Sequence, residues 1–221
     1  MTATITVFDI GNVLVRWDPR QLVCKLFDDD QEMETFLAAV LPDIAAADNG
    51  TPYEETIADI KARYPHWADQ IDAYERRWEE TFTPAIDGSV AILSELKAAG
   101  KPFYALSNFT RDQFALGCMM YPFLNDFTGR VMSFDVGACK PDPAMYRTLF
   151  DRFDLAPAQL IFFDDRPENV EAAQAEGMQA HLFTNPDGMR AKLVSAGVLP
   201  KDKPTLMTDS ECTSANEPDG P

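Results

Sequence analysis

Apolar residues recur at two different spacings in the second half of the chain. The segment GSVAILSELKAAGK has Val90, Leu93 and Leu96 at helical spacing and Gly100 placed to end the helix, and PFYALSN follows as a short buried strand. RVMSFDVG, LIFFDD and AHLF have the composition of further strands, and DPAMYRTLFDRF and ENVEAAQAEG lie between them as helices. Strands that alternate with helices form a parallel sheet with helices packed against it, so the pattern predicts an α/β fold.

A long helical insertion separates the first strand from this alternation. Residues 4–9 are continuously apolar like the later strands, but the next comparable strand begins only at residue 102. Between them, RQLVCKLF, EMETFLAAVL, PYEETIADIKARY and WADQIDAYERRWEETF all have apolar positions three or four residues apart. We therefore expect a core domain formed by residues 1–18 and 85–200, and a helical cap formed by residues 19–84. Residues 201–221 are polar and rich in Pro, Ser, Thr and Asp, which predicts a flexible tail.

Composition excludes several classes of function. Apolar residues make up 46% and charged residues 25% of the chain, which is ordinary for a globular protein. The formal charge of −17 disfavours nucleic acid as a partner. The four cysteines are scattered without metal-ligand spacing, and neither an export signal nor a membrane-length apolar run is present. We expect a cytoplasmic protein, monomeric or homodimeric, with no membrane or nucleic acid partner.

Polar residues stand where three predicted strands end. Asp9 ends the first strand, Ser107 and Asn108 end the second, and Asp164 and Asp165 end a later one, while Lys140 precedes a proline-started helix. Each of them alone is equally consistent with a helix cap, a turn or a solvated side chain. Parallel strands, however, place their carboxyl ends at one edge of the sheet, where ligands bind. Carboxylates gathered there suit Mg²⁺, which keeps several waters and binds a substrate phosphate.

Four segments in this order resemble a known family. FDIGNVL, ALSN, CKPDP and FFDDRPENVEAA are similar to the four motifs of the haloacid dehalogenase-like (HAD) hydrolase superfamily, and the helical insertion after the first motif is similar to its helical-cap subfamily. Within the superfamily, these segments are similar to a group of small phosphatases that includes the bacterial sugar-1-phosphate phosphatase and the amino-terminal phosphatase domain of soluble epoxide hydrolase. The resemblance implies a Rossmann-like parallel sheet with helices on both faces and an inserted α-helical cap. It also implies a Mg²⁺-dependent phosphatase of small phosphorylated metabolites such as sugar phosphates.

The family's functional residues can be carried over by motif position. Asp9 matches the nucleophile that forms an aspartyl-phosphate, and Lys140 matches the basic residue that offsets its charge. Ser107 and Asn108 match the phosphate-binding motif. The metal would be held by Asp9, Asp165 and the backbone carbonyl of Gly11, with Asp164 and Asn169 in supporting positions.

One position departs from the pattern. Most phosphatases of this superfamily carry a second Asp two residues after the nucleophile, as general acid, and here that residue is Gly11. Such an acid is typically worth about 10²–10⁴ in rate. Either the leaving group needs little protonation, or the acid comes from elsewhere, with His66 and Asp18 as candidates. A metal-independent 2-haloacid dehalogenase that uses Asp9 is the alternative, and a catalytically idle binder of phosphorylated ligands is a third possibility.

The insertion is expected to set substrate specificity, because a cap closes over the sheet edge. Arg16 and Trp17 immediately follow the first motif and must lie near Asp9, so we predict that they contact the substrate. Trp67 and Trp78 are expected to pack inside the cap.

Overall fold

The computed structural model describes residues 4–46 and 53–201, and a parallel sheet lies at its centre. The sheet contains β1 (Ile5–Phe8), β4 (Phe103–Ser107), β5 (Gly129–Met132), β6 (Leu160–Asp164) and β7 (Gln179–Leu182). In the described part of the chain the spatial order is β5-β4-β1-β6-β7, and all neighbours are parallel. The predicted α/β fold is confirmed. Because the chain first extends the sheet on one side of β1 and then on the other, a crevice forms at the carboxyl ends of β4, β1 and β6.

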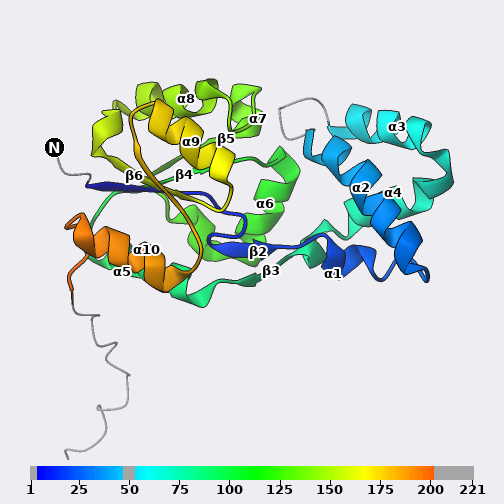
Figure 1. Ribbon diagram of the computed structural model, residues 1–221, viewed down its shortest axis with the longest axis horizontal. Helices are drawn as coiled ribbons and strands as arrows, with labels where there is room; N and C mark the ends of the chain where they lie inside the picture. Colours follow the sequence, from blue (N-terminus) through cyan, green and yellow to red (C-terminus); the bar gives the residue numbers. More distant parts are fainter. Residues whose placement is uncertain (1–3, 47–52, 202–221) are drawn as a thin grey trace, which may run out of the picture.

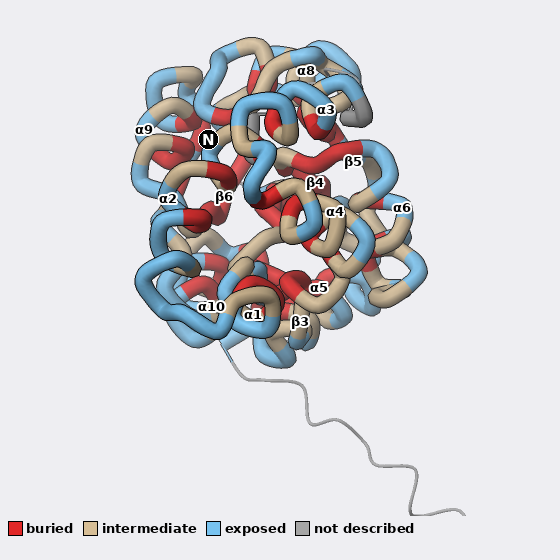
Figure 2. The backbone as a smooth tube through the Cα atoms, turned by 90° about the vertical axis from the view of Figure 1, so that its right-hand side faces the viewer, coloured by how far each residue is buried: buried red, intermediate tan, exposed pale blue. Residues whose placement is uncertain are grey.

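Helices cover both faces of this sheet, with α8 and α9 on one side and α5 and α10 on the other (Figure 1). The helices that follow the insertion are α5 (Asp87–Ala98), α6 (Arg111–Met120), α7 (Ser133–Val136), α8 (Pro143–Phe153), α9 (Pro167–Ala175) and α10 (Pro186–Ser195), with 3-10 turns η4 (Pro122–Asn125) and η5 (Pro157–Gln159). Adjacent strand residues point to opposite faces of the sheet. Val7 therefore packs in the hydrophobic cluster under α8 and α9, whereas Phe8 packs in the hydrophobic cluster on the opposite face. Figure 2 shows that burial is concentrated along the strands, and both β4 and β6 are buried throughout.

The insertion after β1 is mainly helical and lies at one end of the molecule (Figure 1). It contains α1 (Arg20–Val23), α2 (Asp30–Ala46), α3 (Tyr53–Arg63), η2 (Pro65–Trp67), α4 (Ala68–Arg76) and η3 (Trp78–Thr81). Trp67 and Trp78 are each only 5% exposed. Trp67 packs inside the insertion as expected, against Phe36 and Tyr64, whereas Trp78 also packs against Phe109, which lies outside the insertion. The entering and leaving chains pair as a short antiparallel ribbon, β2 (Val15–Trp17) with β3 (Phe82–Ala85), which the sequence pattern did not indicate.

The interpretation of RVMSFDVG as a single strand was wrong beyond Met132. The strand ends there and the short helix α7 begins at Ser133. The Ser133 hydroxyl accepts a hydrogen bond from the Phe109 N–H (2.9 Å) and donates to the Phe109 carbonyl oxygen (3.1 Å). These two bonds tie the loop after β4 to the start of α7.

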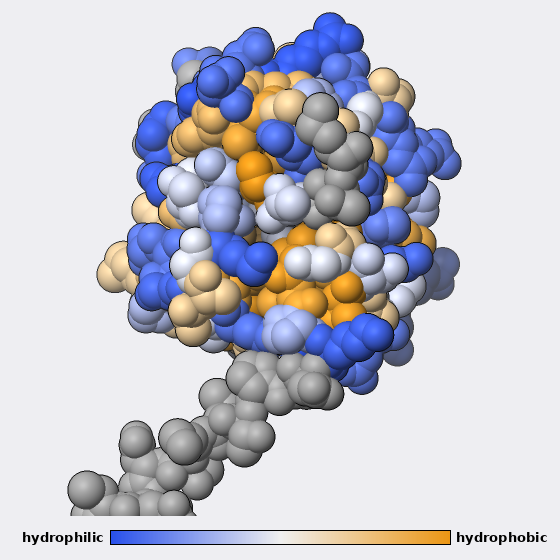
Figure 3. Space-filling view, turned by 90° about the vertical axis from the view of Figure 1, so that its left-hand side faces the viewer, coloured by the Kyte–Doolittle hydropathy of each residue, from blue (hydrophilic) through white to orange (hydrophobic). Residues whose placement is uncertain are grey.

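The surface away from the insertion shows hydrophobic residues in the middle and hydrophilic ones around them (Figure 3). Within residues 4–46 and 53–201, none of the helices has the length and apolar character needed to cross a bilayer. Apart from Lys201, the predicted flexible tail (201–221) lies outside the described residues.

Candidate active site

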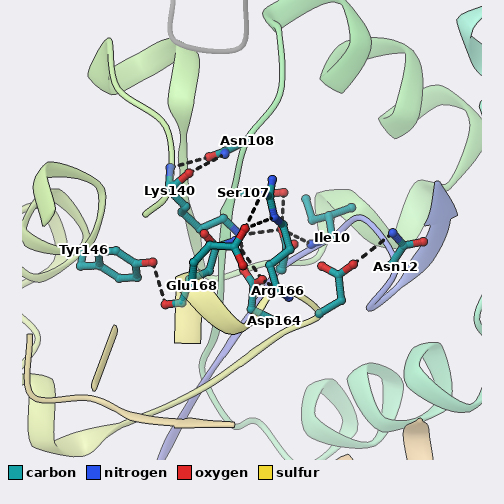
Figure 4. A network of polar contacts seen from close by, with 12 residues as sticks. Ile10, Asn12, Ser107, Asn108, Lys140, Tyr146, Asp164, Arg166 and Glu168 are labelled. Carbon is teal, nitrogen blue, oxygen red and sulfur yellow. Dashed lines mark hydrogen bonds and ion pairs between the residues drawn. The ribbon is translucent and has the colours of Figure 1, made fainter. Parts of the chain in front are cut away.

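Asp9 lies directly after β1, and three donors bind one of its carboxylate oxygens. The donors come from Ile10, Ser107 and Lys140, which are labelled in Figure 4. Its Oδ1 accepts hydrogen bonds from the Ile10 N–H (2.8 Å) and the Ser107 hydroxyl (2.5 Å). The Lys140 Nζ lies 2.8 Å from the same oxygen. No donor from the described residues reaches Oδ2. The carboxylate is therefore held in one orientation with its second oxygen available to a substrate.

Lys140 is a buried cation between two carboxylates. Its Nζ lies 2.6 Å from Asp164 Oδ2 as well as 2.8 Å from Asp9 Oδ1, and its side chain is 1% exposed. Burial lowers the pKa of the ammonium, but Asp164 and Asp9 more than offset this, so the pKa of Lys140 is raised. Lys140 therefore stays protonated and carries a permanent positive charge at the sheet edge.

Asp164 is a positioning residue, because both of its oxygens are occupied. Oδ2 forms an ion pair with the Lys140 Nζ. Oδ1 accepts hydrogen bonds from the Arg166 N–H (2.9 Å) and the Asn169 side-chain amide (2.9 Å). The Asn169 backbone carbonyl in turn accepts from the Tyr146 hydroxyl (2.9 Å). Tyr146 was missed by the sequence reasoning, since its place in an amphipathic helix marks it only as a core residue. The network fixes Lys140 and the start of α9 together (Figure 4).

Asp165 is bound more loosely and is held by a residue that sequence reasoning also missed. The Asn12 side-chain amide donates to Asp165 Oδ2 (3.1 Å), and Asn12 Oδ1 accepts from the Trp17 N–H (3.0 Å). Asn12 has φ of 56°, in the left-handed region that Asn tolerates better than most residues. The Gly11-Asn12 pair inside the first motif was the available signal, because such pairs mark tight turns.

The site has the donor set and the charge imbalance of a divalent-cation site. Oxygen atoms of Asp9, Asp164 and Asp165 lie within 4.8 Å of one another. Burial, and then the charge of Asp164, raise the pKa of Asp9 to about 6, although Lys140 lowers it, and burial likewise raises the pKa of Asp165. Asn169 Oδ1 is buried without a hydrogen-bond partner in the described structure. Three carboxylates face one lysine, so a hard cation such as Mg²⁺ fits these residues.

The two residues predicted to bind phosphate are both at this edge, but their side chains also bind protein groups. The Ser107 hydroxyl donates to Asp9, as described above. Asn108 binds the backbone of Lys140 on both sides: its amide nitrogen donates to the carbonyl oxygen (3.2 Å) and its Oδ1 accepts from the N–H (2.9 Å). Asn108 thereby places Lys140 in the site and retains one amide hydrogen for a ligand.

A cavity of about 630 Å³ opens over this edge. Of the predicted site residues, it is lined by Asp9, Gly11, Trp17, Ser107, Asn108, Lys140, Asp165 and Asn169. Arg16 instead lines a smaller cavity of about 240 Å³ on the other side of Asp165. Neither candidate acid, His66 or Asp18, is among the described residues that line either cavity.

An open parallel sheet with a buried lysine among carboxylates at its switch point defines a hydrolase of the HAD-like class. A model of the haloacid dehalogenase-like hydrolase family matches residues 4–177, and the chain belongs to this family.

Phosphatases are among its curated relatives. The chain is 27% identical to a validoxylamine A 7'-phosphate phosphatase of Streptomyces hygroscopicus over 69% of its own length and 74% of the relative. It is also 27% identical to a sesquiterpene phosphatase of Aspergillus oryzae over 80% of this chain and 88% of the relative.

Solved structures share the fold at lower identity. A HAD family enzyme of Bacteroides thetaiotaomicron, in complex with magnesium and inorganic phosphate, superposes with a TM-score of 0.64 at 19% identity, over 83% of this chain and 95% of that one. The L-2-haloacid dehalogenase of Xanthobacter autotrophicus superposes with a TM-score of 0.60 at 16% identity, over 90% of this chain and 85% of that one. The fold is therefore shared with an enzyme that was crystallised with magnesium and phosphate and with a haloacid dehalogenase.

Proposed function

We propose that the protein is a phosphatase that hydrolyses small phosphate monoesters, with Asp9 as nucleophile and Mg²⁺ as cofactor. The observation that carries the proposal is the convergence of Asp9, Asp164 and Asp165 within 4.8 Å around a single lysine. A cluster with this excess of negative charge favours a metal-dependent reaction on a phosphate over metal-free displacement of a halide. Sugar phosphates are one class of such esters, suggested by the sequence resemblance.

Asp9 acts in two displacements. Its Oδ2 attacks phosphorus, the bond from phosphorus to the ester oxygen breaks, and that oxygen leaves as an alcohol after taking a proton from water. Water then attacks the phosphorus of the aspartyl-phosphate, which releases inorganic phosphate and restores Asp9. The fixed Oδ1 keeps Oδ2 in the same direction in both steps.

The other residues position groups and balance charge. Lys140 lies beside Asp9 and offsets part of the charge of the bound phosphate. The Asp9 and Asp165 carboxylates and the Gly11 carbonyl would hold Mg²⁺, which when bound supplies further positive charge next to the phosphoryl oxygens. The helical insertion, residues 19–84, would act as the cap over the cavity.

The test is product release from a panel with and without a chelator. The panel contains acetyl phosphate, p-nitrophenyl phosphate, glucose 1-phosphate and L-2-chloropropionate. We expect phosphate release that is lost with EDTA and in Asp9→Asn. Asp126→Asn, which alters a carboxylate paired with the exposed Lys97, is the matched control and should retain activity. Chloride release that is indifferent to EDTA would instead identify a dehalogenase, and no release from any compound would favour the idle binder.

A further inference from the structure

The main cavity has two chemically different ends. The charged end is the site around Asp9 and Lys140. The other end, here called the apolar wall, consists of Leu41, Ile44, Tyr74, Trp78, Phe82 and Phe109. None of these residues carries a charge, and Tyr74 alone among them has a side-chain hydroxyl.

The apolar wall is tightly packed next to the charged end. Trp78 and Phe82 stack with ring centroids 5.1 Å apart, and the Phe109 ring meets them edge-on at 6.1 and 5.6 Å. The three residues are 5%, 0% and 6% exposed. Phe109 follows Asn108 directly in the chain, so the wall begins where the predicted phosphate-binding residues end.

Trp17 extends this surface at the edge of the cavity. It is one of the large hydrophobic residues that remain exposed in the described structure, at 38%, and it lines the same cavity. An exposed aromatic residue beside a cavity is a common contact for an apolar ligand group.

A polar leaving group would be poorly matched to the apolar wall and Trp17. Hydroxyl groups that face apolar side chains lose hydrogen bonds to water without gaining partners, which costs free energy. Among the described lining residues on this side of the cavity, the polar side-chain groups are the amide of Gln113 on α6, the Tyr74 hydroxyl and the Trp78 indole N–H, and Tyr74 and Trp78 are 1% and 5% exposed. A sugar ring carries several hydroxyls, and each one that faces the apolar wall loses its hydrogen bonds to water.

We propose that the leaving group of the natural substrate is a bulky apolar ring system, so that the protein hydrolyses the phosphate monoester of a hydrophobic ring-bearing alcohol or phenol. This inference rests on the proposed phosphatase function and narrows its substrate class away from sugar phosphates. The phosphate lies at the charged end and the ring packs against the apolar wall and Trp17.

Two matched pairs of esters test the inference. Cyclohexylmethyl phosphate and glucose 6-phosphate are both esters of a primary alcohol on a six-membered ring, and they differ chiefly in the ring hydroxyls. Phenyl phosphate and 2-naphthyl phosphate have leaving groups of similar acidity and differ in apolar area. We expect kcat/KM to be about tenfold or more higher for the more apolar ester of each pair, since burial of even one methylene in an apolar pocket is worth that much. Equal values, or faster turnover of glucose 6-phosphate, would overturn the inference.

Substitution of Trp17, the exposed residue beside the apolar wall, supplies a second readout. Trp17→Ala should reduce the preference for cyclohexylmethyl phosphate about tenfold, because the lost ring contacts affect the apolar ester selectively. Met119→Ala is the matched control: Met119 is 80% exposed and does not line the cavity, so the preference should stay at the wild-type value. An unchanged preference in Trp17→Ala would remove Trp17 from the binding surface.

Failure of the proposed function would be visible separately. If none of the four esters releases phosphate in the presence of Mg²⁺, the phosphatase proposal fails. Binding of cyclohexylmethyl phosphate and glucose 6-phosphate to Asp9→Asn, measured by calorimetry, still compares the two leaving groups without turnover. Tighter binding of the apolar ester by about tenfold supports the inference, and equal binding contradicts it.

Discussion

Replacement of Lys140 by Met is the sharpest test of the electrostatic description of the site. The substitution keeps a long unbranched side chain but removes the cation that lies 2.8 Å from Asp9 and 2.6 Å from Asp164. Both the Lys140 and Asp164 side chains are buried, at 1% and 0% exposure. Removing one partner of a buried ion pair costs about 3–5 kcal/mol, since a charge remains without compensation. For a protein of this size that corresponds to a loss of about 6–20 °C in melting temperature.

The destabilisation should depend on pH in a defined direction. The pKa of Asp9 is raised to about 6, and Lys140 lowers it, so the substitution raises it further. A carboxyl group whose pKa is higher in the folded than in the unfolded protein stabilises the fold when protonated and loses that contribution as pH rises through the folded pKa. The deficit of Lys140→Met relative to wild type should therefore be larger at about pH 8 than at about pH 6.

Thermal unfolding followed by circular dichroism, with EDTA present throughout, measures both effects. Lys97→Met is the matched control, because the Lys97 Nζ is also 2.6 Å from a carboxylate, that of Asp126, but the lysine side chain is 59% exposed. Such surface pairs contribute about 0–1 kcal/mol. If Lys140→Met lowers the melting temperature no more than Lys97→Met does, the buried lysine does not stabilise the site as described.

Three further predictions concern the residues around Asp9. Gly11→Asp should raise kcat/KM for an alkyl phosphate at least about tenfold and leave kcat/KM for p-nitrophenyl phosphate nearly unchanged, because an added acid assists only poor leaving groups. The assay is phosphate release, and equal effects on both esters would exclude a general-acid role for the introduced carboxyl group. Millimolar Mg²⁺ should raise the melting temperature of the wild type but not of Asp165→Asn, and equal shifts would place the ion elsewhere. The melting temperature of the Asn12→Ala variant should be about 2–4 °C below that of the Asn12→Gly variant, since both lose the side-chain amide but only glycine adopts φ of 56° without cost. Equal melting temperatures would show that this conformation carries no strain.

The sequence predicted the sheet well because its strands are continuous apolar runs bounded by turn residues. LIFFDD and PFYALSN became β6 and β4, and the polar residues that end these runs lie at one edge as expected. The ribbon of β2 and β3 escaped prediction because strands of 3 and 4 residues are too short to show alternation. The segment WADQIDAYERRWEETF was expected to be helical throughout, but the helix α4 ends at Arg76 and a 3-10 turn follows.

The polar end of the cavity was more predictable than its apolar wall. Carboxylates and a lysine at strand ends are conspicuous, because such groups are rarely buried without a function. Ile44 and Tyr74, which are 6% and 1% exposed, have the spacing of ordinary helix core residues. Helical periodicity reports that a side chain faces inward, but it does not distinguish a packed core from the wall of a cavity. Only the arrangement of the insertion over the sheet edge makes that distinction.

Gly11 lines the cavity beside both Asp9 and Trp17. An added Cβ at Gly11 would meet Trp17 Cβ at 3.9 Å, an ordinary van der Waals contact, so the surrounding space does not require glycine here. Packing therefore does not explain the lack of a carboxyl group at position 11, and a leaving group that needs little protonation would suit such a site. The neighbouring Asn12 bonds both the Trp17 N–H and Asp165, which ties the edge of the substrate cavity to a predicted metal ligand. A phenolic ring satisfies both demands, because it leaves readily as an anion and packs against the aromatic side chains beside the nucleophile.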